Sequence, residues 1–476
     1  MTRRKLGALD TLFLQLESRE TMMHVAGLLP FTPPPDAPPD FLLKLGLELR
    51  EARQVCSPWN LKLSSPELLQ NPLQSWVEDP GLDVDYHVRR SALPTPGDER
   101  ELGVLISRLH SHPVDFHRPP WEFHLIEGLE GGRFAMYVKV HHALVDGFTA
   151  VRMLARSLAT DPGDLHKPLF FSIPQPPRVG REPDETPADF TTMLRTLRAE
   201  VGSFKNVGSA LLDLGRSERR GKHLTSPLQA PRCILNSRIG RNRRFATQQY
   251  ELARLKELAS LAGGTLNDII VALCAGGLRR FLLELGALPE KPLIAFLPVN
   301  LRPKDDPGGG NAVGAILASM ATDIEDPRRR LETIMASTQR AKEQLHGMSQ
   351  VAMLAYSALL MAPFGLQTLQ ARTGLAKRLP MNFNVCISNV PGPQEPLYFR
   401  GARLDATYPV SIPTHGMALN ITCQSYAGTL GFGFVGCRDS VPHLQKLAVH
   451  TGEALLELEK TLRPARRASK RTRRNA

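Results

Sequence analysis

The alternation of hydrophobic and polar positions at residues 134–140 predicts a β-strand. The even-numbered positions, from Phe134 to Val140, are large and apolar, and the odd-numbered ones are Ala, Tyr and Lys, which is the period of a strand with one buried face. If the strand continues for two more residues, His142 lies on the apolar face and His141 on the opposite one. Beyond Gly147 the apolar residues recur at roughly helical spacing, so we predict the succession strand, turn, helix.

Similar patterns elsewhere predict a mixed α/β protein. Helical spacing occurs at residues 41–53 and again after Asp98, which has the residue type of an N-cap. Residues 293–299 and 383–388 read as strands, and residues 419–436 as a hairpin that turns near Ala427 and Gly428.

A change of composition divides the chain into regions. Residues 173–177 are rich in proline, and residues 178–189 are charged and interrupted by proline, which is typical of a boundary between folded units. We therefore predict a first lobe at 1–160, a partly helical linker at 161–230, a second lobe at 231–462 and a disordered basic tail at 463–476. A chain of 476 residues is long enough for two hydrophobic cores.

Charge and cysteine usage indicate an intracellular protein. The six cysteines are scattered, which favours a reducing compartment, and no apolar run of signal-peptide length opens the sequence. Seven of the positive charges behind the net charge of +12 lie in 463–476. Such a tail attracts anionic lipid, whereas no recognisable nucleic-acid-binding motif accompanies it. Residues 351–366 are the most apolar stretch of the chain. Three interpretations are open: a buried core helix, the wall of a hydrophobic tunnel, or a segment that enters lipid.

The residues His141, His142, Asp146 and Gly147 form the most informative motif, behind the predicted strand. Imidazole is suited to remove a proton from an alcohol near neutral pH if its ring is held in place. Asp146 either orients the ring or braces the turn by pairing with an arginine, and Gly147 permits a tight turn or a close approach. Histidines that only satisfy polar contacts in a core are the simpler alternative, and the complete motif argues against it. A metal site is disfavoured because adjacent histidines at a strand end point to opposite faces.

With this motif and the segments that flank it, the chain resembles the bacterial wax ester synthase/diacylglycerol acyltransferase family. That family belongs to the larger group of CoA-dependent acyltransferases and condensation domains. Pro120 departs from the leucine usual before the tryptophan and puts the local backbone in doubt. The matching segments lie at residues 9–14, 23–25, 83–88, 118–122, 141–147, 266–268, 298–303, 389–393 and 418–422.

The resemblance implies a two-lobed α/β fold of the chloramphenicol acetyltransferase and condensation-domain type, with a channel that meets the histidine motif. It assigns the general base to His142 and a mainly structural role to Asp146. The implied reaction moves a long-chain acyl group from acyl-CoA, a substrate rather than a cofactor, to a fatty alcohol or a diacylglycerol. A thioester is already activated, so transfer is direct and needs oxyanion stabilisation.

Further site residues follow from the matched segments. Asn267 is a candidate oxyanion donor, although Thr265 and Asp268 also fit a capping box at a helix start. Arg302 is the candidate partner of Asp146. The remaining candidates are proposed to border the substrate channel: Tyr356 and Leu360 in the apolar stretch, and Asn389, Pro391 and Gly392 in the matched turn.

Two alternatives to this enzyme stay open. One is a non-catalytic lipid-coat or scaffold protein, which has no need of the intact motif, and the other is a natural-product condensing acyltransferase. We expect a cytoplasmic protein, peripheral to the inner membrane or to lipid inclusions. Neither the oligomeric state nor the chain-length preference follows from the sequence.

Overall fold

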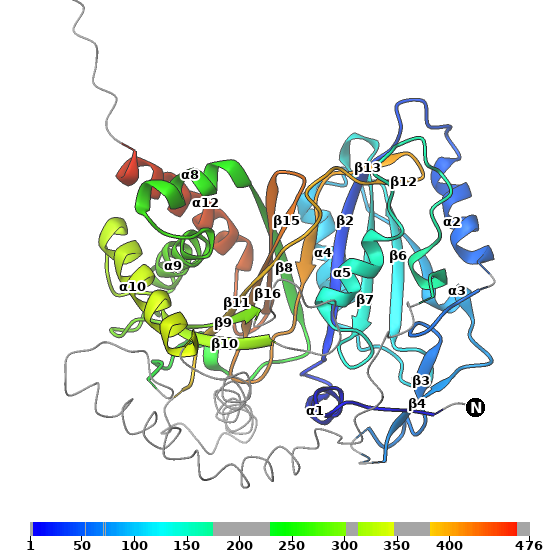
Figure 1. Ribbon diagram of the computed structural model, residues 1–476, viewed down its shortest axis with the longest axis horizontal. Helices are drawn as coiled ribbons and strands as arrows, with labels where there is room; N and C mark the ends of the chain where they lie inside the picture. The colour runs from blue at the N-terminus through cyan, green and yellow to red at the C-terminus, as the bar shows by residue number, and fades with distance from the viewer. Residues whose placement is uncertain are drawn as a thin grey trace, which may run out of the picture.

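The alternating segment forms strand β7 (Phe134–His141), in the middle of a seven-stranded first sheet. The computed structural model describes residues 3–52, 54–69, 71, 73–174, 229–300, 313–346 and 381–463. The strand order is β12-β13-β2-β7-β6-β5, and β14 also pairs with β2 (Figure 1). The other strands of this sheet are β2 (His24–Thr32), β5 (Val88–Ala92), β6 (Trp121–Glu127), β12 (Tyr398–Phe399), β13 (Ala402–Leu404) and β14 (Tyr408–Val410).

Helices cover both faces of the first sheet. The even-numbered side chains of β7 pack in one cluster with α2 (Phe41–Glu51) and α5 (Gly147–Ala155). Odd-numbered residues, including Tyr137, pack against α4 (Glu99–His110). The Asp98 carboxylate caps α4 by accepting hydrogen bonds from Arg100 and Glu101. The predicted strand, the helix after Gly147 and the helix after Asp98 are therefore confirmed.

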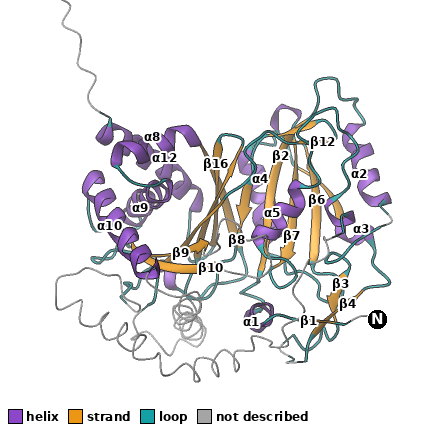
Figure 2. Ribbon diagram, in the orientation of Figure 1, coloured by secondary structure: helices purple, strands orange, loops and turns teal. Residues whose placement is uncertain are grey.

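The second lobe contains a six-stranded sheet with the order β10-β9-β11-β15-β16-β8. The predicted hairpin forms β15 (Leu419–Tyr426) and β16 (Thr429–Cys437), and its turn residues Ala427 and Gly428 both have positive φ. The predicted strands appear as β9 (Ile294–Asn300) and β11 (Val385–Val390). Helices gather against one side of this sheet (Figure 2). The remaining elements are β8 (Arg243–Glu251), β10 (Val313–Ser319), α8 (Leu252–Ala262), α9 (Leu266–Glu284), α10 (Pro327–His346) and α12 (Leu444–Leu462).

Strands β12, β13 and β14 cross from the second half of the chain into the first sheet. Strand β14 and the residue before it lie against β16 at two glycines. A Cβ atom at Gly433 would overlap the carbonyl oxygen of Pro409, and one at Gly431 would overlap that of Thr407. Only glycine permits this approach of two backbones. Residues 398–410 thus belong to the first sheet, a crossing that no local pattern predicted.

A small sheet and helix α1 (Ala8–Leu16) lie beside the end of β7. This sheet contains β1 (Arg4–Lys5), β3 (Leu61–Leu63) and β4 (Ser75–Glu78). Leu14 of α1 and Trp76 of β4 share a hydrophobic cluster with Ala143 of the histidine motif. Helix α3 (Val84–His87) precedes β5. Helix α1 and the small sheet thus form part of the surroundings of the motif.

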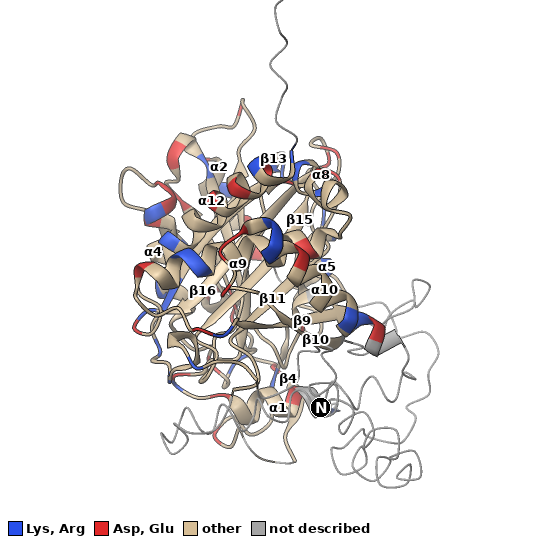
Figure 3. Ribbon diagram, turned by 90° about the vertical axis from the view of Figure 1, so that its left-hand side faces the viewer, with Lys and Arg blue, Asp and Glu red and all other residues tan. Residues whose placement is uncertain are grey.

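Charged residues lie mainly on the outer helices and loops, while the strands between them are largely uncharged (Figure 3). Within the described ranges, no single helix has both the length and the apolar character to cross a bilayer. Helices α8 and α9 together have that length and composition, but they meet at an angle of 98°. The apolar stretch at 351–366, the linker from 175 to 228 and the tail from 464 onwards lie outside the described residues.

Candidate active site

The two histidines stand where β7 ends, and the main chain is fixed on both sides of them. The backbone N–H of His141 donates to the carbonyl of Pro120 at 2.9 Å, and that of His142 donates to the carbonyl of Met23 at 2.9 Å. His141 is also paired with His24 in the register of β2 and β7. Pro120 therefore leaves the local backbone intact, and its carbonyl holds the motif.

His141 is the buried member of the pair. Its Nε2 lies 3.3 Å from Oε2 of Glu17, and its Nδ1 accepts a hydrogen bond from the N–H of Ala143 at 3.2 Å. Because an accepting nitrogen carries no proton, the neutral ring is protonated at Nε2 and donates to Glu17. The same carboxylate oxygen accepts from the N–H of Met23 at 2.6 Å. His141 is thus held in one tautomer and one orientation.

His142 is partly exposed and has different surroundings. Its ring lies 4.2 Å from that of Phe13, between centroids, and its Nδ1 is enclosed without a hydrogen-bond partner. Burial lowers the pKa of His142 to about 4; the negative charge of Asp146 opposes this shift, and His141 adds to it. The imidazole is therefore neutral at pH 7 and can accept a proton. The two histidines therefore have different surroundings in the structure.

Asp146 ends the turn and begins helix α5. Its Oδ1 accepts a hydrogen bond from the N–H of Thr149 at 2.8 Å, and its Oδ2 accepts from the Thr149 hydroxyl at 2.9 Å. These are the contacts of an N-cap residue. Both oxygens face the helix, so Asp146 acts on His142 through its charge rather than through a hydrogen bond. Its predicted partner, Arg302, lies outside the described residues.

Gly147 is the first residue of α5, and the space in front of it is open. A Cβ atom placed there would meet no other atom within 4 Å, and its φ is not among the positive values of the chain. Neither a left-handed backbone nor a protein neighbour therefore requires glycine here. This open space therefore lies next to Asp146, the residue whose charge raises the pKa of His142.

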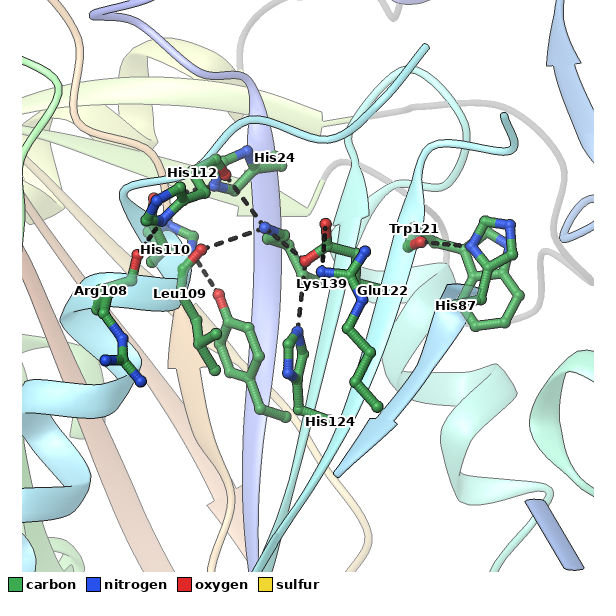
Figure 4. Close-up of polar contacts among 12 residues, drawn as sticks. His24, His87, Arg108, Leu109, His110, His112, Trp121, Glu122, His124 and Lys139 are labelled. Carbon is green, nitrogen blue, oxygen red and sulfur yellow. Dashed lines mark hydrogen bonds and ion pairs between the residues drawn. The ribbon is translucent and has the colours of Figure 1, made fainter. Parts of the chain in front are cut away.

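A buried polar network lies on the face of β7 that carries His141 (Figure 4). Lys139 has no exposed side-chain surface, and its Nζ lies 2.8 Å from Oε2 of Glu122. The ammonium also donates to the carbonyls of Leu109 and His112, at the end of α4. Burial acts to raise the pKa of Glu122, but His124, Lys139 and Arg89 together lower it to about 2. The network joins β7 to β6 and to α4.

Two further histidines extend this network towards the second half of the chain. His110 contacts the Tyr137 hydroxyl at 2.9 Å and the carbonyl of Ser411 at 3.0 Å. His24 contacts the carbonyl of His110 at 3.1 Å. Burial lowers the pKa of His110 to about 3 and that of His24 well below its ordinary value. Both are therefore neutral structural groups. In the parts of the chain that the structure describes, no cluster of three or more His, Cys, Asp or Glu side chains could hold a metal ion.

Asn267 and Asp268 lie at the start of α9 in the second lobe. The Asp268 carboxylate accepts from the N–H of Thr265 at 2.8 Å, and Thr265 caps the helix in return, so the predicted capping box is confirmed. Asp268 also accepts from the hydroxyl of Thr338 on α10 at 2.6 Å. Asn267 is partly exposed, and within the described residues no recorded hydrogen bond joins it to the histidine motif.

The other predicted channel residues fall into two groups. Tyr356 and Leu360 lie outside the described residues. Asn389 is the exposed penultimate residue of β11, and the N–H of Gly392 donates to the Ser425 hydroxyl at 3.1 Å. The structure places this turn, which also includes Pro391, beside the hairpin of β15 and β16.

This turn lies towards the far end of the first sheet. Tyr426, next to Ser425, donates from its hydroxyl to the carbonyl of Leu404 at 3.0 Å, and Leu404 pairs with Phe31 of β2. His24, beside the motif, lies seven residues away at the opposite end of β2, a separation of roughly 23 Å along a strand. Asn389, Pro391 and Gly392 therefore do not join the histidines.

Glu17 and Phe13 belong to the site, but the sequence reasoning did not identify them. Both come from α1 or its end, more than a hundred positions before the motif. The signal that could have found Glu17 is its place between two matched segments, at 9–14 and 23–25. Nothing in the neighbouring sequence pattern predicts that a carboxylate at this position is buried.

Comparison with known proteins identifies the family of this chain. Residues 6–270 match the wax ester synthase/diacylglycerol acyltransferase catalytic domain, and residues 309–459 match the C-terminal domain of the same proteins. A Mycobacterium tuberculosis protein provisionally named a diacylglycerol O-acyltransferase is 54% identical over 96% of this chain and 97% of its own length. The O-acyltransferase WSD of Acinetobacter baylyi is 39% identical over 95% of this chain and 96% of its own.

Solved structures show the same relationship. The wax ester synthase/diacylglycerol acyltransferase from Marinobacter aquaeolei VT8 superposes with a TM-score of 0.77 at 38% identity, covering 96% of this chain and 99% of that one. The first condensation domain of the calcium-dependent antibiotic synthetase, at 18% identity and a TM-score of 0.54, shares the fold. The expected two-lobed acyltransferase fold is therefore confirmed, and the chain belongs to the wax ester synthase/diacylglycerol acyltransferase family of O-acyltransferases.

Proposed function

We propose that this protein transfers a long-chain acyl group from acyl-CoA to the hydroxyl of a fatty alcohol or a diacylglycerol, with His142 as general base. The observation that carries the proposal is the contrast between the two histidines. His141 is buried and tied to Glu17, whereas His142 is neutral and partly exposed, with only its Nδ1 enclosed. Nε2 is therefore the nitrogen available to a substrate.

In the proposed reaction, Nε2 of His142 takes the proton of the acceptor hydroxyl as its oxygen attacks the thioester carbonyl. The tetrahedral intermediate then collapses, the carbon–sulfur bond breaks, and the imidazolium returns the proton to the departing CoA thiolate. No acyl group is attached to the protein, because a thioester already has a good leaving group. Asn267 remains the candidate donor to the oxyanion.

A small apolar cavity in the first lobe is suited to part of an acyl chain. Its lining includes Leu29, Val138 and Leu158 and is apolar apart from Ser157. Val138 lies on β7, four residues before His142, which corresponds to roughly 13 Å of extended chain. We propose that the end of the chain reaches this cavity. Leu158→Trp should then reduce activity with palmitoyl-CoA much more than with butyryl-CoA, and an equal effect on both would exclude the cavity.

Palmitoyl-CoA with hexadecanol or a diacylglycerol, followed by release of free thiol, tests the reaction. Direct transfer within a ternary complex predicts intersecting initial-rate lines, whereas parallel lines or a trapped acyl-protein would refute it. Thiol release that requires neither acceptor would contradict O-acyl transfer. No turnover with either acceptor, together with retained acyl-chain binding, would favour the scaffold alternative.

We also propose that the protein works in the cytoplasm and docks reversibly on the inner membrane or on lipid inclusions, because its acceptors are insoluble in water. Support comes from exposed leucines beside the motif: Leu12 on α1 is 39% exposed, and Leu68 and Leu73 between β3 and β4 are 64% and 85% exposed. Residues 3–5 next to them are Arg, Arg and Lys, all exposed.

Sedimentation with anionic vesicles tests this docking. Replacing Leu12, Leu68 and Leu73 by serine should weaken binding, whereas Leu456→Ser, which changes an exposed leucine on α12, should not. Deleting residues 463–476 should reduce the part of the binding that salt screens. Equal binding by all variants would place the docking surface elsewhere on the chain.

A further inference from the structure

Arg243 is a buried cation at the junction of the two lobes. It begins β8, the edge strand of the second sheet, and is 3% exposed. Its guanidinium donates to the carbonyl of Gly240 at 2.6 Å and, across the junction, to the carbonyl of Glu20. Burial lowers the pKa of Arg243 to about 10, with Cys437 and Glu17 acting in the opposite direction, so the group is charged at neutral pH.

Helix α4 fixes the start of β8 to the first lobe. The N–H of Arg243 donates to the Ser111 hydroxyl at 2.8 Å, and the N–H of Phe245 donates to the Ser107 hydroxyl at 2.9 Å. These alternate N–H groups point outwards from the edge of the second sheet. Ser107 lies in the last turns of α4, and Ser111 is the residue that caps its end, one helical turn further on. The guanidinium is therefore held in a defined position relative to the first lobe.

A short stretch, residues 17–23, connects this guanidinium to both histidines of the site and is called the 17–23 segment below. The first residue of the segment binds His141 through its carboxylate, and the last residue accepts the backbone hydrogen bond of His142. Between these two anchors, the carbonyl of Glu20 receives the guanidinium of Arg243. One short segment is thus fixed at three points, two in the active site and one in the second lobe.

We propose that Arg243 is a positioning residue for acyl transfer, which sets the two histidines through the 17–23 segment; this inference rests on the proposed function. Without the guanidinium, the carbonyl of Glu20 loses its charged donor and the segment loses its anchor in the second lobe. The carboxylate that holds His141 and the carbonyl that holds His142 are then free to shift. A displacement of about 1 Å at reacting groups lowers rates by roughly 10²-fold.

Arg243→Met, which keeps the length of the side chain but removes its charge and donors, tests the proposal. Its kcat should fall by roughly 10²-fold with the KM for acyl-CoA changed by no more than about twofold, the pattern of a loss confined to the transition state. Arg243→Lys, which retains the charge and places its donors on a single nitrogen, should recover much of kcat. The matched control is Arg330→Met, because Arg330 is also 3% exposed and donates to the carbonyls of Ile324 and Glu325 in the second lobe.

Two further measurements separate positioning from a general loss of stability. The ring N–H of His141, observed by NMR with ¹⁵N-histidine and identified by its absence in His141→Gln, should shift or broaden in Arg243→Met and stay unchanged in Arg330→Met. Ser107→Ala removes one hydrogen bond of the lobe junction but leaves the Arg243 guanidinium in contact with the 17–23 segment, so it should lower kcat much less than Arg243→Met does. The proposal is overturned if Arg243→Met retains the kcat of the control, if Ser107→Ala loses as much, or if the His141 signal does not change. A wild-type protein without turnover would reject the proposed function, and the NMR comparison would still decide whether Arg243 sets His141.

Discussion

Replacing Gly147 by alanine should separate catalysis from folding at the active site. Gly147 is the first residue of α5, and a Cβ atom there would contact nothing within 4 Å. Alanine restricts the unfolded chain more than glycine does and suits a helix better, so the substitution should raise the free energy of unfolding by about 0.4–1 kcal/mol. For a domain of ordinary size this corresponds to roughly 1–4 °C in Tm.

Activity should change in the opposite direction. If the open space beside Gly147 admits the reacting atoms, a methyl group there displaces them from His142, and a displacement of about 1 Å lowers the rate roughly 10²-fold. The assay is release of CoA thiol from palmitoyl-CoA at saturating acceptor, together with thermal unfolding of the same preparations.

Gly452→Ala is the matched control for this substitution. Gly452 lies inside α12 of the second lobe, and a Cβ there would make ordinary contacts of 3.6 and 3.7 Å with Tyr250 and Gln248. The control should gain a similar stability and keep full activity. If Gly147→Ala is as active as the control, no substrate uses the space, and the reason for glycine in the motif must be sought elsewhere.

Four further changes test separate parts of the structure. His142→Ala should lower kcat by roughly 10²–10⁴-fold, the contribution of general-base catalysis, while calorimetry shows acyl-CoA binding retained; an unchanged kcat would remove His142 from the mechanism. Asp146→Ala should lower the free energy of unfolding in urea by about 1 kcal/mol, because the cap of α5 is lost, and Asp146→Asn should lower it much less. Equal losses in the two variants would mean that the charge of Asp146 matters and not the cap. Lys139→Met should destabilise the protein by leaving buried Glu122 with Arg89 as its remaining cation, at a cost below the about 3–5 kcal/mol of a buried charge without any partner. Adding Glu122→Leu should recover much of this loss, and no recovery would show that the two residues act independently. The free energy of unfolding should fall as the pH drops from 6.5 towards 4, because burial holds the pKa of His110 at about 3 and that of His142 at about 4. In this range the unfolded chain binds protons that the folded protein does not. Urea unfolding of His110→Gln should show a weaker dependence of stability on pH, and an unchanged dependence would contradict the assignment.

Much of the fold could be read from local patterns in the sequence. The strand before the histidines, the cap at Asp98, the capping box at Thr265 and the hairpin turn at Ala427 all appear where they were expected. Each depends on side-chain periodicity or on hydrogen bonds between residues a few positions apart. His141 ends that strand and His142 follows it directly.

The sequence by itself thus determined the local elements, the family and the position of the histidine motif behind its strand. Only the tertiary structure decided what holds those residues in place: Glu17 reaches His141 across 124 positions, Glu122 pairs with Lys139 between two strands, and Arg243 binds the 17–23 segment from the other lobe. It also placed residues 398–410 in the first sheet. Such contacts depend on strand register and on packing between distant segments, and a charged residue that will be buried has no local periodicity that distinguishes it from one on the surface.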